Sequence, residues 1–155
     1  MRKIILSTLL TCSVITSGFI YDKTAIVNSK SANCVLVRGE PSYEYENPIS
    51  VGRKIEHPIS WVYLSSSGER ELTCEIVDSS ATTWTGKLAI PDNSNMEMVQ
   101  LSIYLDGNLE QKISIFRGNV TELNIDVGNH KNVSFNYKVK QGNGNHLYFL
   151  KWDLN

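Results

Sequence analysis

An excess of charge of either sign is what this 155-residue chain most clearly lacks. Its 15 lysine and arginine residues nearly balance 16 aspartate and glutamate residues, which leaves a formal net charge of −1. Because a nucleic-acid-binding domain normally carries a basic stripe, this balance argues against binding to nucleic acid. It also argues against a charge-driven association with membranes. Hydrophobic residues make up 41% of the chain, which is enough for the packed core of one ordinary domain.

Long apolar runs are lacking too, apart from one stretch at the N-terminus, "MRKIILSTLLTCSVITSGF". Arg2 and Lys3 precede an apolar segment over 4–15, and the small residues Ser17 and Gly18 suit a cleavage site. The segment is shorter than the roughly 20 residues that cross a bilayer. We therefore predict a cleaved secretory signal peptide over 1–18, no membrane span and a secreted, extracellular protein, with the periplasm or cell surface as other destinations. A lipoprotein acylated at Cys12 is the alternative.

Cysteine is scarce, with three residues in the chain, and Cys12 would leave with the signal peptide. Cys34 and Cys74 then form an even pair, for which a disulfide is the default in an oxidising compartment. The bond would close a loop of about 40 residues and contribute about 3–4 kcal/mol in the chain-entropy picture. Two buried free thiols are the alternative.

Catalytic signatures are absent from the sequence. It contains no Gly-x-Ser-x-Gly elbow, no His-Glu-x-x-His motif, no phosphate-binding loop and no dinucleotide fingerprint. Its three histidines, at positions 57, 130 and 146, have no metal-site spacing. Most carboxylates alternate with apolar residues, which places them on solvated faces. We therefore expect a protein that is not an enzyme and needs no cofactor or metal, with a small hydrolase as the weakest alternative.

What the sequence does contain is strict alternation of apolar and polar residues, the pattern of strands with one wet face. It is clearest in four stretches, and five further strands are separated from these by clusters of Gly, Asn, Ser or Pro. We predict an all-β, antiparallel β-sandwich or jelly roll of about nine strands over 34–155, preceded by a flexible tail over 19–33. The predicted strands are 34–38, 59–64, 71–77, 82–90, 99–105, 109–116, 121–127, 132–140 and 147–154.

Two local features bear on this prediction. Residues 109–120 also fit a helical stripe, but Gly118 and the β-branched Ile113 and Ile115 favour a strand. Asp106-Gly107 lies between two strand-like runs, and Asp-Gly is a preferred hairpin turn because it tolerates positive φ. We therefore interpret Asp106 as a turn residue, not as a metal ligand or a catalytic carboxylate.

The stretch 39–60, "GEPSYEYENPISVGRKIEHPIS", resembles the early part of NPCBM domains, which are carbohydrate-binding modules of secreted bacterial glycoside hydrolases. In that family a "G…Y…G…H-x-x-S" pattern precedes the first long strands. The residues at the corresponding places here are Gly39, Tyr43, Gly52, His57 and Ser60.

The rest of the domain follows the same family order. Residues 101–115 are similar to its strand–Asp-Gly–strand hairpin, 121–139 to its next pair of strands, and 142–154 to its closing loop and Trp-containing strand. The family's Trp-bearing opening strand is not evident, and its closing Trp-Ala-Asp-Ala pattern is reduced to Trp152-Asp153. The resemblance implies a galactose-binding-like β-sandwich that binds carbohydrate without catalysis.

A sugar site needs aromatic faces for the C–H faces of the ring, and Asn, Asp, His or Gln for its hydroxyl groups. Tyr43 and Tyr45 alternate with glutamates in "SYEYE", and "GNGNHLY" places a histidine where a loop meets a strand. Trp84 shares parity with Leu88, which favours the core over a sugar platform, and parity also assigns Tyr137 and Trp152 to the core. The candidate ligand-binding residues are Tyr43, Tyr45, His57, Trp84, Asn145 and His146.

The leading hypothesis is a secreted, non-catalytic protein that binds carbohydrate or a glycan-bearing surface. The alternative is a module that binds another protein, such as an adhesin or an inhibitor, on the same scaffold. That alternative predicts a contiguous exposed apolar patch instead of a polar-rimmed cleft.

Overall fold

The computed structural model of the protein describes residues 31–155, which form twelve β-strands. The predicted signal peptide over 1–18, Cys12 and most of the predicted tail over 19–33 lie outside the described residues. Ten strands build two antiparallel sheets of five strands each, and the other two pair with each other. The all-β sandwich predicted from the alternating pattern is therefore confirmed.

The first sheet has the spatial order β1-β6-β11-β8-β9. These strands are β1 (Ala32–Arg38), β6 (Glu69–Ile76), β11 (Asn132–Gly142), β8 (Met96–Leu105) and β9 (Asn108–Phe116). The second sheet has the order β10-β7-β12-β5-β2. Its strands are β10 (Val120–Asp126), β7 (Thr83–Ala89), β12 (Asn145–Leu154), β5 (Ser60–Leu64) and β2 (Tyr43–Glu44).

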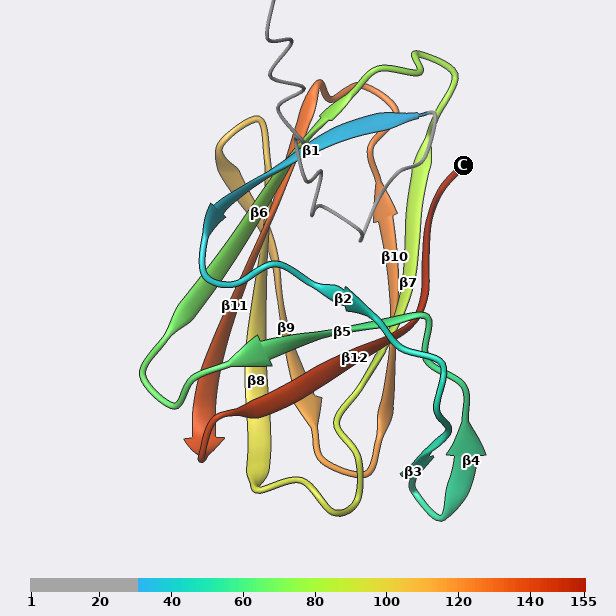
Figure 1. Cartoon of the computed structure of the whole chain (residues 1–155). Coiled ribbons are helices and arrows are strands. Elements are labelled where there is room, and N and C mark those ends of the chain that lie inside the picture. The colour runs from blue at the N-terminus through green and yellow to red at the C-terminus, as the bar shows by residue number, and fades with distance from the viewer. Residues whose placement is uncertain (1–30) are drawn as a thin grey trace, which may run out of the picture.

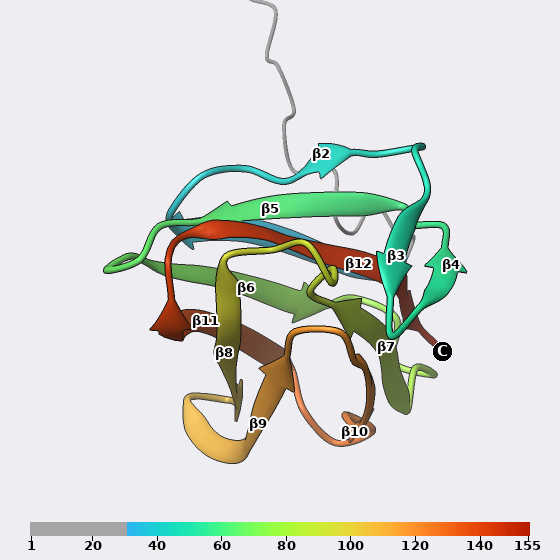
Figure 2. The same cartoon turned by 90° about the horizontal axis from the view of Figure 1, so that it is seen from below.

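The remaining pair is a short hairpin, β3 (Ile49–Val51) and β4 (Lys54–Glu56), beside the second sheet. In Figure 1, β5 and β12 cross in front of β8 and β9, and in Figure 2 they lie in a layer above β6 and β11. All nine predicted strands are present within a few residues, including 109–116, where the helical alternative is wrong. β2, β3 and β4 were missed because two or three residues are too short to display a period of two.

The core lies between the two sheets and is rich in aromatic side chains. Trp84 of β7 packs edge-on against Phe135 of β11 at 5.0 Å and Trp152 of β12 at 5.8 Å, measured between ring centroids. Gly86 is required beneath Trp152, because a Cβ there would lie 2.7 Å from its ring. Burial of such side chains contributes about 1.5–3 kcal/mol each. Tyr137 and Trp152 are buried, which confirms their predicted core positions.

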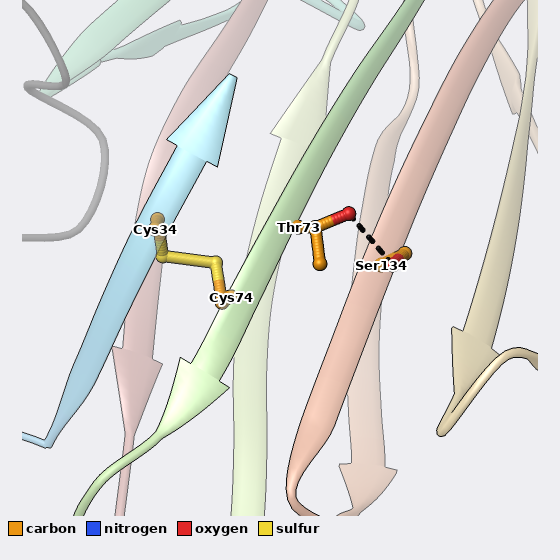
Figure 3. The surroundings of a disulfide bond; sticks show 4 residues. All are labelled: Cys34, Thr73, Cys74 and Ser134. Atoms are coloured by element: carbon orange, nitrogen blue, oxygen red, sulfur yellow. Dashed lines mark hydrogen bonds between the residues drawn. A yellow bond between two sulfur atoms is a disulfide. The ribbon is translucent and has the colours of Figure 1, made fainter. Parts of the chain in front are cut away.

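The disulfide joins the edge strand β1 to β6. Cys34 and Cys74 are direct register partners with Cα atoms 3.9 Å apart, and their sulfur atoms are bonded. Figure 3 shows the bridge beside a hydrogen bond between Thr73 Oγ1 and Ser134 Oγ, 2.8 Å long, which links β6 to β11. The predicted Cys34–Cys74 disulfide is confirmed, and the free-thiol alternative is wrong.

Asp106 and Gly107 form the two-residue turn between β8 and β9, with φ values of 48° and 84°. Two positive φ values in succession are those of a type I′ hairpin turn, so the turn interpretation is confirmed. The Asp106 carboxylate has a second role, because it accepts hydrogen bonds from the backbone N–H groups of Lys131 (3.1 Å) and Asn132 (3.0 Å). Its other oxygen lies 3.0 Å from Nδ1 of His130. Asp106 therefore ties the hairpin to the start of β11.

Two negative findings apply to residues 31–155. That part of the chain contains no helix long and apolar enough to cross a membrane. It also contains no group of three or more His, Cys, Asp or Glu side chains arranged to hold a metal ion.

Candidate functional site

The outer face of the second sheet carries a cluster of aromatic side chains. In β5 the alternation turns Val62 and Leu64 into the core, where both are buried. It turns Trp61 and Tyr63 outward, and Tyr63 is 39% exposed while Trp61 is half-buried. Val62 and Leu64 already anchor β5 in the core, so the two outward-facing aromatic rings are not needed for that packing.

The neighbouring strands bring further rings to the same face. Their register places Trp61 directly opposite both Tyr43 of β2 and Tyr148 of β12, and places Tyr63 opposite His146 of β12. Facing side chains on one side of a sheet lie within contact distance of each other. We call this set the aromatic face: Tyr43, Tyr45, Trp61, Tyr63, His146 and Tyr148.

The ring geometry shows that the aromatic face is continuous. The Trp61 centroid lies 4.2 Å from that of His146 in an edge-on arrangement and 4.9 Å from that of Tyr43 in a tilted one. The His146 ring lies 5.7 Å from the Tyr63 ring. The contacts run from edge strand β2 across β5 to β12, so the rings form one contiguous cluster.

Apolar contacts of Tyr148 support the aromatic face from one side. Tyr148, 8% exposed, packs edge-on against Tyr45 at 5.2 Å and joins a buried cluster with Ile49 and Val51 of the β3–β4 hairpin. Burial, with a smaller contribution from Tyr45, raises the pKa of Tyr148 to about 12, so its phenol is neutral at all physiological pH values. The hairpin therefore fixes Tyr148, and with it the position of the neighbouring rings.

His146 is the polar group at the centre of the face. Partial burial lowers its pKa, which favours the neutral imidazole at neutral pH. A neutral imidazole has one donor and one acceptor nitrogen, and a hydroxyl group pairs with either. The side-chain oxygen of Asn145 accepts a hydrogen bond of 2.8 Å from the backbone N–H of His146, which fixes the start of β12.

A groove beyond the hairpin is the chief alternative site on this sheet. It has a volume of about 390 Å³ and a polar lining that includes Lys54, Glu56, Lys87 and Glu122. Lys87 Nζ and Glu122 Oε1 are 2.6 Å apart, and this contact raises the pKa of the lysine. Its lining residues include no aromatic side chain, so a sugar there would find no ring to stack on.

The structure brings together three of the six predicted site residues, Tyr43, Tyr45 and His146, on one face. Asn145 adjoins it at the start of β12, where its side-chain oxygen accepts a hydrogen bond from the backbone N–H of His146. His57 is exposed in the loop between β4 and β5, and no ring contact joins it to the face within the described part of the chain.

Trp84 requires a correction, because it is fully buried between the sheets and its indole nitrogen is enclosed as well. A ligand at the surface cannot reach it. Its parity with Leu88, which favoured the core, was the correct signal.

Trp61, Tyr63 and Tyr148 were missed as site residues. "SWVYL" does show Trp61 and Tyr63 on one side of a strand with Val62 and Leu64 on the other, so the signal was present in β5. Placing Tyr148 beside Trp61 requires the pairing of β5 with β12, which no local sequence pattern reveals.

The fold is that of known carbohydrate-binding modules. The tandem CBM51 modules of Sp3GH98, a family 98 glycoside hydrolase from Streptococcus pneumoniae, match with a TM-score of 0.58 at 11% identity, over 79% of this chain and 47% of that one. A CBM51 from Clostridium perfringens GH95, solved with methyl-galactose, matches with a TM-score of 0.56 at 7% identity, over 79% of this chain and 92% of that one.

A structure of CBM51-2 and INT domains from Clostridium perfringens ZmpB also has a TM-score of 0.56, at 12% identity, over 79% of this chain and 29% of that one. This chain therefore spans less than a third of the ZmpB chain and about half of the Sp3GH98 chain. No protein-family profile matches the sequence, and no curated protein is significantly similar to it. The likeness confirms the β-sandwich that the NPCBM resemblance implies.

Proposed function

We propose that the protein is a secreted, non-catalytic carbohydrate-binding protein whose aromatic face is the sugar-binding surface. The observation that carries the proposal is the row of Tyr43, Trp61 and His146, with ring centroids 4.9 and 4.2 Å apart, on the outside of the sheet. The apolar C–H face of a pyranose ring packs on Tyr43 and Trp61, and the imidazole of His146 pairs with a hydroxyl group.

Two further observations support the proposal. The solved structures of the same fold are carbohydrate-binding modules, one of them described with methyl-galactose. The Cys34–Cys74 disulfide supports export, because disulfides persist in oxidising compartments and are rare where thiols are kept reduced.

A polysaccharide and glycan-array screen of the mature protein tests the binding proposal, with Trp61→Ala as the site variant. Phe116→Ala is the matched control, because Phe116 is 47% exposed on β9 of the other sheet. We expect retention on at least one saccharide, a loss of about tenfold or more in affinity for Trp61→Ala, and an affinity within about twofold of the original for Phe116→Ala.

Two results would contradict the proposal. One is the absence of binding to any saccharide by a sample that circular dichroism shows to be folded. The other is saccharide binding that Trp61→Ala leaves unchanged. Binding to proteins from which all glycans have been removed, without binding to any saccharide, would favour the protein-interaction alternative instead.

A further inference from the structure

The β3–β4 hairpin is joined to the rest of the protein at one residue. Within residues 31–155, every hydrogen bond between the hairpin (49–56) and another segment involves Asp92, in the connection between β7 and β8. The two strands of the hairpin pair only with each other. Because an isolated two-stranded hairpin is marginally stable in water, this one depends on its contacts with the body of the protein to stay in place.

Asp92 holds the hairpin with its backbone and its side chain together. Its backbone N–H donates a hydrogen bond of 2.9 Å to the carbonyl of Ser50, and its Oδ2 accepts one of 2.7 Å from the Ser50 hydroxyl. The carboxylate also accepts hydrogen bonds from the backbone N–H groups of the turn residues Gly52 (2.9 Å) and Arg53 (3.1 Å). These bonds, that of the Ser50 hydroxyl most of all, lower the pKa of Asp92, so the carboxylate is ionised at neutral pH.

Gly52 and Gly118 leave room for this contact. Gly52 and Arg53 have φ values of 60° and 64°, which are those of a two-residue type I′ turn. A Cβ on Gly52 would lie 2.8 Å from the carbonyl oxygen of Gly118, and a Cβ on Gly118 would lie 2.9 Å from Oδ1 of Asp92. A side chain at either position would therefore push the hairpin turn away from Asp92.

The opposite side of β3 reaches the aromatic face. Alternation places the two residues that flank Ser50 on the other face of the strand, where both are buried against Tyr148. Trp61 packs against the same buried cluster. Contacts therefore run from Asp92 through β3 to Trp61, the residue on which the proposed function places the sugar ring.

We infer that Asp92 is a positioning residue for the sugar-binding surface: by holding the β3–β4 hairpin in place, it keeps Tyr148 and Trp61 in the arrangement that binds the ring. The inference rests on the proposed function and adds to it a residue outside the aromatic face. When the hairpin is in place in only a fraction of the molecules, the apparent affinity falls by that fraction. Loss of the Asp92 carboxylate therefore weakens binding without removing any ring from the face.

Asp92→Ala is the site variant, and Asp106→Ala is its matched control. Both carboxylates are exposed and accept two backbone hydrogen bonds that tie a hairpin to another segment, but Asp106 belongs to the sheet that lacks the aromatic face. We expect both variants to have a lower melting temperature. In calorimetric titration with the array saccharide that the original protein retains most strongly, we expect an affinity loss of about fivefold or more for Asp92→Ala and a change within about twofold for Asp106→Ala.

Asp92→Asn tests whether the hydrogen bonds are the cause. The amide keeps an acceptor for Gly52 and offers a donor to the Ser50 hydroxyl, but it has no second acceptor for the N–H of Arg53. We expect an affinity loss of about two- to threefold, between the values of the original protein and Asp92→Ala. If the alanine variant does not fold, this milder variant takes its place in the test.

The indole N–H signal of Trp61 gives a readout that needs no saccharide. In nitrogen–proton correlation spectra of the free proteins, we expect this signal to move in both Asp92 variants and to stay in place in Asp106→Ala. A general loss of stability would not produce this difference, because it would affect the Asp106 variant as well.

The outcomes separate this inference from the proposed function. Unchanged saccharide affinity in folded Asp92→Ala, or in Asp92→Asn if the alanine variant does not fold, would overturn the role of Asp92 and leave the proposed function standing. A stationary Trp61 signal in the same variant would overturn it too. Equal losses of affinity in the Asp92 and Asp106 alanine variants would also do so, because affinity would then follow overall stability. Failure of the original protein to bind any saccharide in the screen would overturn both proposals.

Discussion

At the scale of single residues, Asp106 shows how one side chain combines a turn with a tertiary contact. Its positive φ belongs to the hairpin turn, and its carboxylate binds the backbone of Lys131 and Asn132. The turn was predictable from the sequence, because Asp-Gly between two alternating runs is a local signal. The contact with 130–132 was not, because it joins residues about 25 positions apart that meet only once β8 and β11 have paired.

Substitutions at Asp106 separate these two roles. We expect Asp106→Asn to keep most of the stability, because the amide oxygen still accepts both backbone hydrogen bonds and asparagine tolerates positive φ. Asp106→Ala loses the acceptor and the tolerance, and we expect its melting temperature to fall by about 3–6 °C. A calorimetric scan of the three proteins measures this order. An alanine variant as stable as the original would show that the carboxylate contributes nothing.

The same carboxylate makes stability depend on pH. Hydrogen bonding to His130 first, and then to the backbone, lowers the pKa of Asp106, and hydrogen bonding to Ser50 first does the same for Asp92. A carboxyl group whose pKa is lower in the folded state than in the unfolded state stabilises the protein at pH values above the unfolded pKa of about 3.9. This stabilisation is lost as the pH falls through the lower, folded pKa. We expect the melting temperature to drop below about pH 4, and to drop less steeply for Asp106→Asn. If the melting temperature fell equally steeply with pH in the original protein and in Asp106→Asn, Asp106 would not be a source of the pH dependence.

The tryptophans divide sharply between core and surface. Trp84 is fully buried, whereas Trp61 is half-buried on the aromatic face. We expect Trp84→Phe to lower the free energy of unfolding by about 1–3 kcal/mol with unchanged saccharide affinity per folded molecule. Trp61→Ala should change stability less and affinity more. Urea unfolding measures the stability of both variants, and calorimetric titration measures their saccharide affinity. A loss of affinity in Trp84→Phe but not in Trp61→Ala would refute this division of roles.

At the scale of elements, prediction succeeded where a strand was long enough to show its period. The runs 121–127 and 132–140 lie within one or two residues of β10 and β11. β2, at two residues, is defined by its pairing with β5 and not by its own composition. The aromatic face likewise depends on strand pairing, because its rings are brought together by the register of β2, β5 and β12. Sequence alone therefore predicted Tyr43, Tyr45 and His146 as separate candidates but not as one surface.

The disulfide acts on the first of these elements. β1 is an edge strand with exposed Val35 and Val37, and Cys34–Cys74 fastens it to β6. We expect the Cys34→Ala/Cys74→Ala double variant to lose about 3–4 kcal/mol of unfolding free energy. Urea unfolding with and without a reductant measures this loss. The reductant should destabilise the original protein and leave the double variant unaffected, and an equal effect on both would argue against the bond in solution.

At the scale of the whole molecule, the proposed binding surface is separate from the core that holds the fold. The core between the sheets and the disulfide hold the fold, while the outer face of the second sheet carries rings that the core does not need. The β3–β4 hairpin supports that face from one side. A rigid surface of this kind suits a ligand that binds with little change in the protein.

The indole N–H signals of the three tryptophans test the central claim most directly. Trp84 and Trp152 have buried indole nitrogens in the core, and Trp61 lies on the aromatic face. In a nitrogen–proton correlation spectrum recorded during titration with a bound saccharide, we expect the Trp61 indole signal to shift progressively while the other two stay in place. Saturation of binding with a stationary Trp61 signal would contradict the account and place the sugar elsewhere on the molecule.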